Sequence, residues 1–104
     1  MKLRGYSVYD RKALQYHPPF FASTDGAAVR SFSDLANDPE TQVGRHPGDY
    51  TLYFVGEYDD QKGHMIPMDP IGHVIDANAL IRIEQKLPFF AEAMKNNPQP
   101  EGAK

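Results

Sequence analysis

The chain has 104 residues, no cysteine and a formal net charge of −3. This length suits one small domain with a modest core, and the lack of cysteine excludes a disulfide framework and a thiolate metal site. Apolar runs stay well below the ~20 residues that a membrane-spanning helix needs, and residues 1–4 are too few and too polar for a signal peptide. We therefore expect a one-domain protein in a reducing cytoplasm, with no membrane contact.

Charge is distributed unevenly along the chain. Residues 1–30 carry five Lys/Arg and two Asp/Glu, residues 31–61 carry one and seven, and residues 62–104 carry five of each. A basic face beside an acidic face suits a protein that binds a polyanion on one side, or a dimer with complementary patches. A solvated surface with chance asymmetry is the simpler interpretation of the same pattern.

The first part of the chain reads as extended backbone. Residues 5–10 are β-branched and aromatic with no breaker after Gly5, which predicts a strand with Tyr6 and Val8 on one face. After a turn, residues 14–17 extend again, and residues 20–22 form a short strand.

A helix is predicted next, over about 25–37. Ser23 or Thr24 is a suitable N-cap, and apolar residues at helical spacing give one buried stripe. Pro39 disfavours helical geometry at the residue before it, which ends the helix. The polar segment 39–49 with its prolines and glycines is expected to be a loop.

The clearest strand covers residues 49–58. Both of its faces are apolar in the middle, which is typical of a central strand. Residues 59–63 form a hairpin loop with Gly63 in a left-handed conformation, and residues 64–68 return as a strand that Pro67 marks as an edge. Tyr53 and Val55, on the face opposite Leu52, are a possible dimer surface.

The carboxyl-terminal part is predicted to be a turn at 69–72 followed by a helical segment at about 77–95. The fold expected is therefore α+β: a small antiparallel sheet with one packed helix and a carboxyl-terminal helical segment. We expect a single domain over residues 1–95 and a disordered tail over residues 96–104.

Catalytic and metal-binding patterns are absent from the sequence. The four histidines (His17, His46, His64 and His73) form no HxxxH or HExxH pair. Acidic side chains lie in loops and at a helix end, and no Ser-His-Asp order, GxSxG elbow or glycine-rich phosphate loop occurs. We therefore predict no enzyme activity, no cofactor and no metal site.

The candidate binding residues lie in the amino-terminal third, where aromatic and cationic side chains alternate. Rings can stack on unpaired bases, and Arg or Lys can neutralise phosphates. The predicted phosphate contacts are Arg4, Arg11, Lys12 and Arg30, and the predicted stacking rings are Tyr9, Tyr16 and Phe21. The alternative is that some of these rings only fill a small core.

An ordered set of motifs along the chain resembles one known family. The opening Tyr6-Ser7-Val8-Tyr9-Asp10-Arg11-Lys12-Ala13 is followed by Pro19-Phe20, by Thr24, Ala28, Arg30 and Phe32 on the predicted helix, by Pro47, Asp49, Tyr50 and Leu52, and by Gly56, Glu57, Tyr58, Asp59 and Gly63. This set is similar to the small non-structural protein of gokushoviruses, single-stranded DNA phages of the microvirus group. The resemblance covers about residues 3–80; Gly5, Lys62 and the longer segment after Leu80 depart from it.

The resemblance implies a non-structural phage protein in the host bacterial cytoplasm, generally assigned to DNA binding. The leading hypothesis is thus a DNA-binding protein, expected as a homodimer, that supports single-stranded DNA replication or its handover to packaging. Its partner would be single-stranded or replicating phage DNA, with affinity that falls steeply with salt.

Two alternatives stay open because the segment 31–61 is strongly acidic. The chain could be an adaptor that binds a basic phage or host replication protein. It could also be a DNA-mimicking regulator of such a protein.

Overall fold

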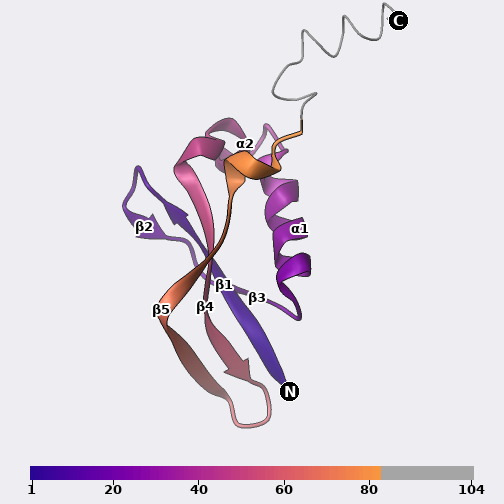
Figure 1. The fold of residues 1–104 in the computed structure, drawn as a ribbon, viewed down its shortest axis with the longest axis vertical. Helices are drawn as coiled ribbons and strands as arrows, with labels where there is room; N and C mark the ends of the chain where they lie inside the picture. Colours follow the sequence, from indigo (N-terminus) through magenta and orange to yellow (C-terminus); the bar gives the residue numbers. More distant parts are fainter. Residues whose placement is uncertain (83–104) are drawn as a thin grey trace, which may run out of the picture.

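The computed structural model describes residues 1–82, and its main feature is an antiparallel sheet curled into a half-barrel (Figure 1). Of the described residues, 45% are in strands and 28% are helical. The elements in chain order are β1 (Lys2–Asp10), β2 (Gln15–Tyr16), β3 (Phe20–Ala22), α1 (Asp25–Ala36), α2 (Gln42–Arg45), the 3₁₀ helix η1 (Pro47–Asp49), β4 (Tyr50–Asp59), β5 (His64–Asp76) and the 3₁₀ helix η2 (Ala77–Leu80).

The sheet has the strand order β2-β1-β4-β5, and β3 pairs with the same side of β1 as β2. Tyr6 lies opposite Phe54 and Val8 opposite Leu52, so these side chains share one face of the central pair. The predicted central strand and the predicted edge position of the strand with Pro67 are both confirmed. Gly63 in the hairpin has φ +70°, as predicted.

One face of the sheet is covered by α1, which runs alongside the strands in Figure 1. Ala28, Phe32 and Ala36 recur at helical spacing and are buried against the sheet. Among residues 1–82, ten buried side chains form this core: Tyr6, Val8, Ala28, Phe32, Ala36, Val43, Tyr50, Leu52, Phe54 and Ala77. We call the other face of the sheet, away from α1, the open face.

The helix α1 begins and ends close to the predicted positions. The Thr24 hydroxyl oxygen accepts the backbone N–H of Ala27 at 3.1 Å and caps the first turn. Asp25 accepts hydrogen bonds from the Tyr6 hydroxyl and from Arg4 Nε, which tie that turn to β1. These contacts fix the helix to one face of the sheet.

The predicted fold class, α+β with a small sheet and a carboxyl-terminal helical segment, is wrong. The structure is mostly β-sheet, because β5 has 13 residues and runs through positions 69–72, where a turn was predicted. Between Phe54 and Gly56, which pair with Gly72 and Pro67, β5 inserts extra residues and bulges out of the ladder. The two prolines of β5 are accommodated at this irregular edge, so their presence did not end the strand.

In the described part of the chain after β5, residues 77–82, the helical structure is the single 3₁₀ turn η2. The Asn37 side chain donates to the carbonyl of Leu80 and accepts the backbone N–H of Arg82. These backbone groups therefore bond to the residue that caps the end of α1, and Ile81 is extended. The rest of the predicted helical segment at 77–95, and the tail predicted at 96–104, lie outside the described residues.

The polar segment 39–49, predicted as a loop, contains the short helices α2 and η1. The Thr41 hydroxyl oxygen accepts the N–H of Gly44, which starts α2, and Val43 contributes to the core. No helix within residues 1–82 is long and apolar enough to cross a membrane.

Candidate functional site

Four rings from four strands form a contiguous cluster on the open face. The ring cluster consists of Tyr9 of β1, Tyr16 of β2, Tyr53 of β4 and His73 of β5. The Tyr9 and Tyr16 centroids lie 4.6 Å apart, and Tyr53 stands edge-on to Tyr9, Tyr16 and His73 at 6.5, 5.9 and 5.9 Å. Tyr16 is 45% exposed, and Tyr9 and Tyr53 are half-buried, so ring surface remains available.

Strand pairing places these rings together. Tyr9 lies opposite Tyr16 in the β1–β2 hairpin, and Tyr53 lies opposite His73 in the β4–β5 pair. Because side chains alternate along a strand, the register that buries Tyr6, Val8 and Leu52 under α1 necessarily turns Tyr9 and Tyr53 to the other face.

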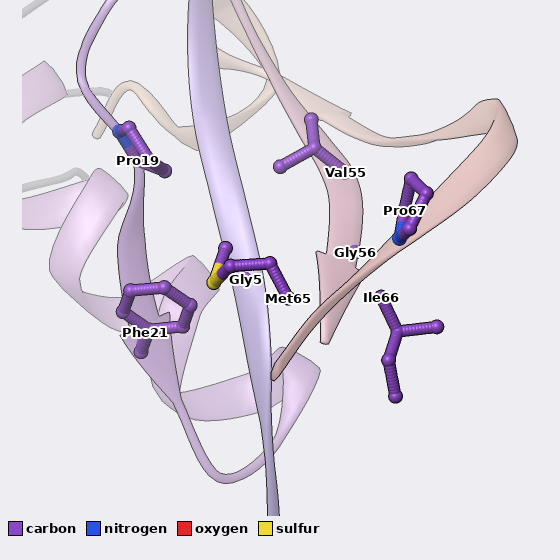
Figure 2. Close-up of a pocket in the computed structure, with 8 residues that line it drawn as sticks. All are labelled: Gly5, Pro19, Phe21, Val55, Gly56, Met65, Ile66 and Pro67. Carbon is purple, nitrogen blue, oxygen red and sulfur yellow. The ribbon is translucent and has the colours of Figure 1, made fainter. Parts of the chain in front are cut away.

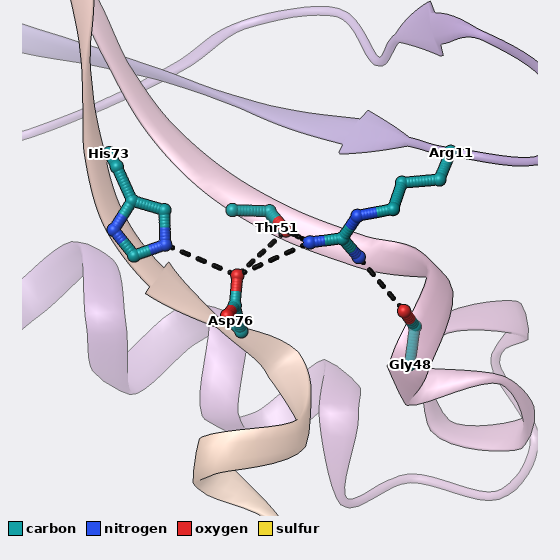
Figure 3. Close-up of polar contacts among 5 residues, drawn as sticks. All are labelled: Arg11, Gly48, Thr51, His73 and Asp76. Atoms are coloured by element: carbon teal, nitrogen blue, oxygen red, sulfur yellow. Dashed lines mark hydrogen bonds and ion pairs between the residues drawn. The ribbon is translucent and has the colours of Figure 1, made fainter.

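A polar network bounds the ring cluster at one end (Figure 3). Asp76 accepts the Thr51 hydroxyl at 2.9 Å, Nη2 of Arg11 at 3.4 Å, and lies 3.2 Å from Nε2 of His73. Arg11 also donates to the Gly48 carbonyl at 2.8 Å and to the Thr51 hydroxyl oxygen. The bonds from His73 and Thr51 lower the pKa of Asp76, so the carboxylate stays charged.

An apolar trough continues from the ring cluster along the open face. It consists of two cavities of about 340 and 300 Å³ that share Pro19 and Val55 as lining residues. Phe21 and Met65 line the first cavity, as Figure 2 shows, and Tyr16 and Ile71 are among the residues that line the second. Tyr16 thus belongs both to the ring cluster and to the wall of the trough.

Two glycines form the floor of the first cavity. Gly5 of β1 lies opposite Gly56 of β4, so neither strand projects a side chain there. A Cβ added to Gly5 would lie 3.1 Å from the Phe21 ring, and a Cβ added to Gly56 would lie 2.5 Å from the Ile66 carbonyl oxygen. The bare backbone lets the Phe21 ring approach the sheet, and this ring is still 40% exposed.

The structure places all three predicted stacking rings on the open face. Tyr9 and Tyr16 are in contact, and Phe21 lies at the far end of the trough, where it packs near Tyr58 at 5.9 Å. Phe21 pairs with Gly5, four positions before Tyr9 on β1, so about 14 Å separate the two ends.

The four predicted cations do not gather beside these rings. Arg4 lies on the helix-covered face, over the Phe54 ring and 3.0 Å from Asp25. Arg30 is exposed on α1, on the side away from its buried stripe. Arg11 is engaged by Asp76 and its neighbours, and Lys12 is exposed in the β1–β2 turn. Of the four, Lys12 and Arg11 are the ones near the ring cluster.

Sequence reasoning missed Tyr53, His73 and Pro19 as part of this surface. The sequence predicts the correct face of the strand for Tyr53, but as a possible dimer surface. A signal was available, because the alternation in β4 sets Tyr53 opposite to Leu52. For His73 no comparable signal was available, because a turn was predicted directly before it, at positions 69–72.

The acidic segment 31–61 is divided between the two ends of the molecule. Asp34, Asp38 and Glu40 surround the end of α1, whereas Asp59 and Asp60 lie in the β4–β5 hairpin, where Asp60 pairs with the terminal amino group. Within residues 1–82, no group of three or more His, Asp or Glu side chains is arranged to hold a metal ion.

Fold and site together define a small β-rich protein with one face covered by a helix and one face carrying rings and an apolar trough. A family model described as Phage ORF5 protein matches residues 3–80, and the chain belongs to that family. The chain is 35% identical over 73 residues to "Protein ORF5" of Chlamydia phage 1, and this alignment covers 66% of this chain and 76% of that protein. The family match over residues 3–80 confirms the span of the resemblance that the motifs predict. No solved structure matches this chain.

Proposed function

We propose that the chain is a phage single-stranded DNA-binding protein and that the open face is its binding surface. The observation that carries this proposal is the ring cluster, which joins three half-exposed tyrosines and a histidine and opens into the trough. Aromatic side chains on an uncovered sheet face can stack on unpaired bases, at about 1–3 kcal/mol per base.

Membership of the phage family supports a role during infection. We propose that binding supports single-stranded DNA replication or its handover to packaging, in the host bacterial cytoplasm and without catalysis. A homodimer is part of this proposal. Its formation through Tyr53 and Val55 would compete with DNA for the open face, whereas dimerisation elsewhere would not.

Binding is tested by fluorescence anisotropy with a labelled single-stranded oligonucleotide of about 12 nucleotides. Tyr16→Ala is expected to weaken binding about tenfold, because about 1.4 kcal/mol of stacking corresponds to a factor of ten. Leu35→Ala removes a similarly exposed apolar side chain from α1 and is the matched control.

Two charge-reversal variants, one on each face, test which side of the molecule binds DNA. Lys12→Glu lies beside the ring cluster and should weaken binding, whereas Arg30→Glu makes the same charge change on the opposite face and should not. Arg11 is unsuitable for this test because its contacts with Thr51 and Asp76 are structural. If wild-type protein binds no oligonucleotide but crosslinks to a replication protein, the adaptor alternative replaces DNA binding.

A further inference from the structure

We infer that the trough binds the faces of unpaired bases, without distinguishing between bases and with little help from phosphate contacts. This inference rests on the proposed function and specifies its ligand as any short run of unpaired bases. It also replaces the steep salt dependence that the sequence predicts with a shallow one.

The first argument is continuity between the ring cluster and the trough. Tyr16 contacts Tyr9 and Tyr53 on one side and lines the second cavity on the other. Val55 and Pro19 then carry the same surface on to Phe21. A strand stacked on the cluster therefore continues into the trough, and about 14 Å of β1 separates Tyr9 at one end from Gly5 at the other.

The second argument is the chemistry of the lining. Among the described residues, those that line the two cavities include no Lys, Arg, Asp or Glu. Ser7 is buried, and its hydroxyl already donates to the His17 carbonyl at 2.7 Å. The surface is thus almost entirely carbon, which suits the faces of bases and leaves their hydrogen-bonding edges to water.

The third argument is the number of nearby cations. Each phosphate neutralised on a single strand contributes about −0.7 to the slope of log affinity against log salt. Four contacts would reduce affinity several hundredfold over a tenfold rise in salt, whereas one contact reduces it about fivefold. Of the four predicted cations, Lys12 is exposed in the β1–β2 turn next to the cluster, Arg11 is held in its ion pair with Asp76, and Arg4 and Arg30 lie away from the cluster. The smaller value is therefore expected.

The experiment compares oligonucleotides of one length by anisotropy, from about 50 to about 500 mM salt. The probes are oligo-dT, oligo-dA, oligo-dC, a duplex, and a strand of abasic sites with the same number of phosphates. We expect similar affinity for the three homopolymers, loss of at least tenfold for the duplex and the abasic strand, and about a fivefold loss across the salt range.

Variants locate the effect in the trough. Val55→Trp fills the point shared by both cavities and should weaken homopolymer binding at least tenfold. Leu35→Trp places the same indole ring on α1 and should leave binding unchanged. If Val55→Trp alters the circular dichroism spectrum, Ile71→Trp at the other wall of the second cavity takes its place.

The outcomes separate this inference from the proposed function. If the wild-type chain binds no oligonucleotide, the proposed function fails and the inference with it. If it binds but holds the abasic strand equally well, loses affinity several hundredfold with salt, or binds one homopolymer alone, DNA binding stands and the inference is overturned.

Discussion

The guanidinium of Arg11 and the carboxylate of Asp76, 65 positions apart in the chain, form an ion pair with Nη2 3.4 Å from Oδ1. The pair joins the β1–β2 turn to the end of β5 and covers the fully buried Thr51. Arg11, selected from the sequence as a phosphate contact, is therefore part of the framework that holds the sheet.

Removing this carboxylate should destabilise the fold. In Asp76→Ala the buried Thr51 hydroxyl loses the oxygen that accepts its proton, and Arg11 loses its ion pair. We expect a loss of about 1–2 kcal/mol in the free energy of unfolding, at the low end for a buried polar group because Asp76 is half exposed. Urea unfolding measures this loss of stability, and Asp34→Ala on α1 is the control variant. Equal midpoints for the two variants would contradict this assignment.

Stability should decrease in acid. Hydrogen bonds from Tyr6 and His73 hold the pKa values of Asp25 and Asp76 below their ordinary range. The pKa of an unfolded Asp is about 3.9, so near and below that pH the unfolded chain binds more protons. The stabilisation is present above about pH 4 and is lost as the pH falls through the folded-state values.

Urea midpoints at pH 6 and at steps down to about pH 3 test this dependence. Asp76→Asn should flatten the curve, because the group that takes up a proton on unfolding is gone. A wild-type midpoint that stays constant or rises on acidification would argue against both pKa shifts.

A matched pair of glycine substitutions tests the floor of the trough. In Gly56→Ala the new Cβ would lie 2.5 Å from the Ile66 carbonyl oxygen, so the β4–β5 pairing must shift. We expect a loss of about 2 kcal/mol or more. In Gly26→Ala, on α1, the nearest atom is 3.9 Å away, and helix propensity should stabilise the fold by up to about 1 kcal/mol. If both substitutions changed the free energy of unfolding in the same direction, a tight strand contact at Gly56 would be excluded.

The packing of α1 can be tested on its two sides. Phe32 is 1% exposed and lies in the core, so Phe32→Ala should cost about 3–5 kcal/mol through the cavity that it leaves. Leu35 is 42% exposed, and Leu35→Ala should cost well below 1 kcal/mol. Thermal unfolding followed by circular dichroism compares them, and a similar change in Tm for both would show that α1 does not pack as described.

Several elements were predictable because they depend on local chemistry. The alternation in 5–10 and 49–58 predicted both central strands and the faces of Tyr6, Tyr9 and Tyr53. The Thr24 cap and the apolar stripe predicted α1, whose ends fall within one residue of the expected positions.

Other elements were not predictable from local pattern. The sequence at 69–72, around Pro70, resembles a turn, yet β5 continues through it because β4 supplies hydrogen-bond partners on both sides of the bulge. The sequence from Ala77 onward predicts a helix, but the Asn37 side chain donates to the Leu80 carbonyl and accepts the backbone N–H of Arg82. In both cases a partner far along the chain outweighs the local preference.

For the candidate site, the sequence alone determined which residue types are available: rings at alternate positions of strands, and cations nearby in the chain. Only the tertiary structure decided that Tyr9, Tyr16 and Phe21 share one face with Tyr53 and His73 while Arg4 and Arg30 lie across the molecule from them. The physical reason is that strand register assigns each side chain to a face, and register is set by long-range pairing and by the helix that covers one side. Nearness in the chain carries no such information.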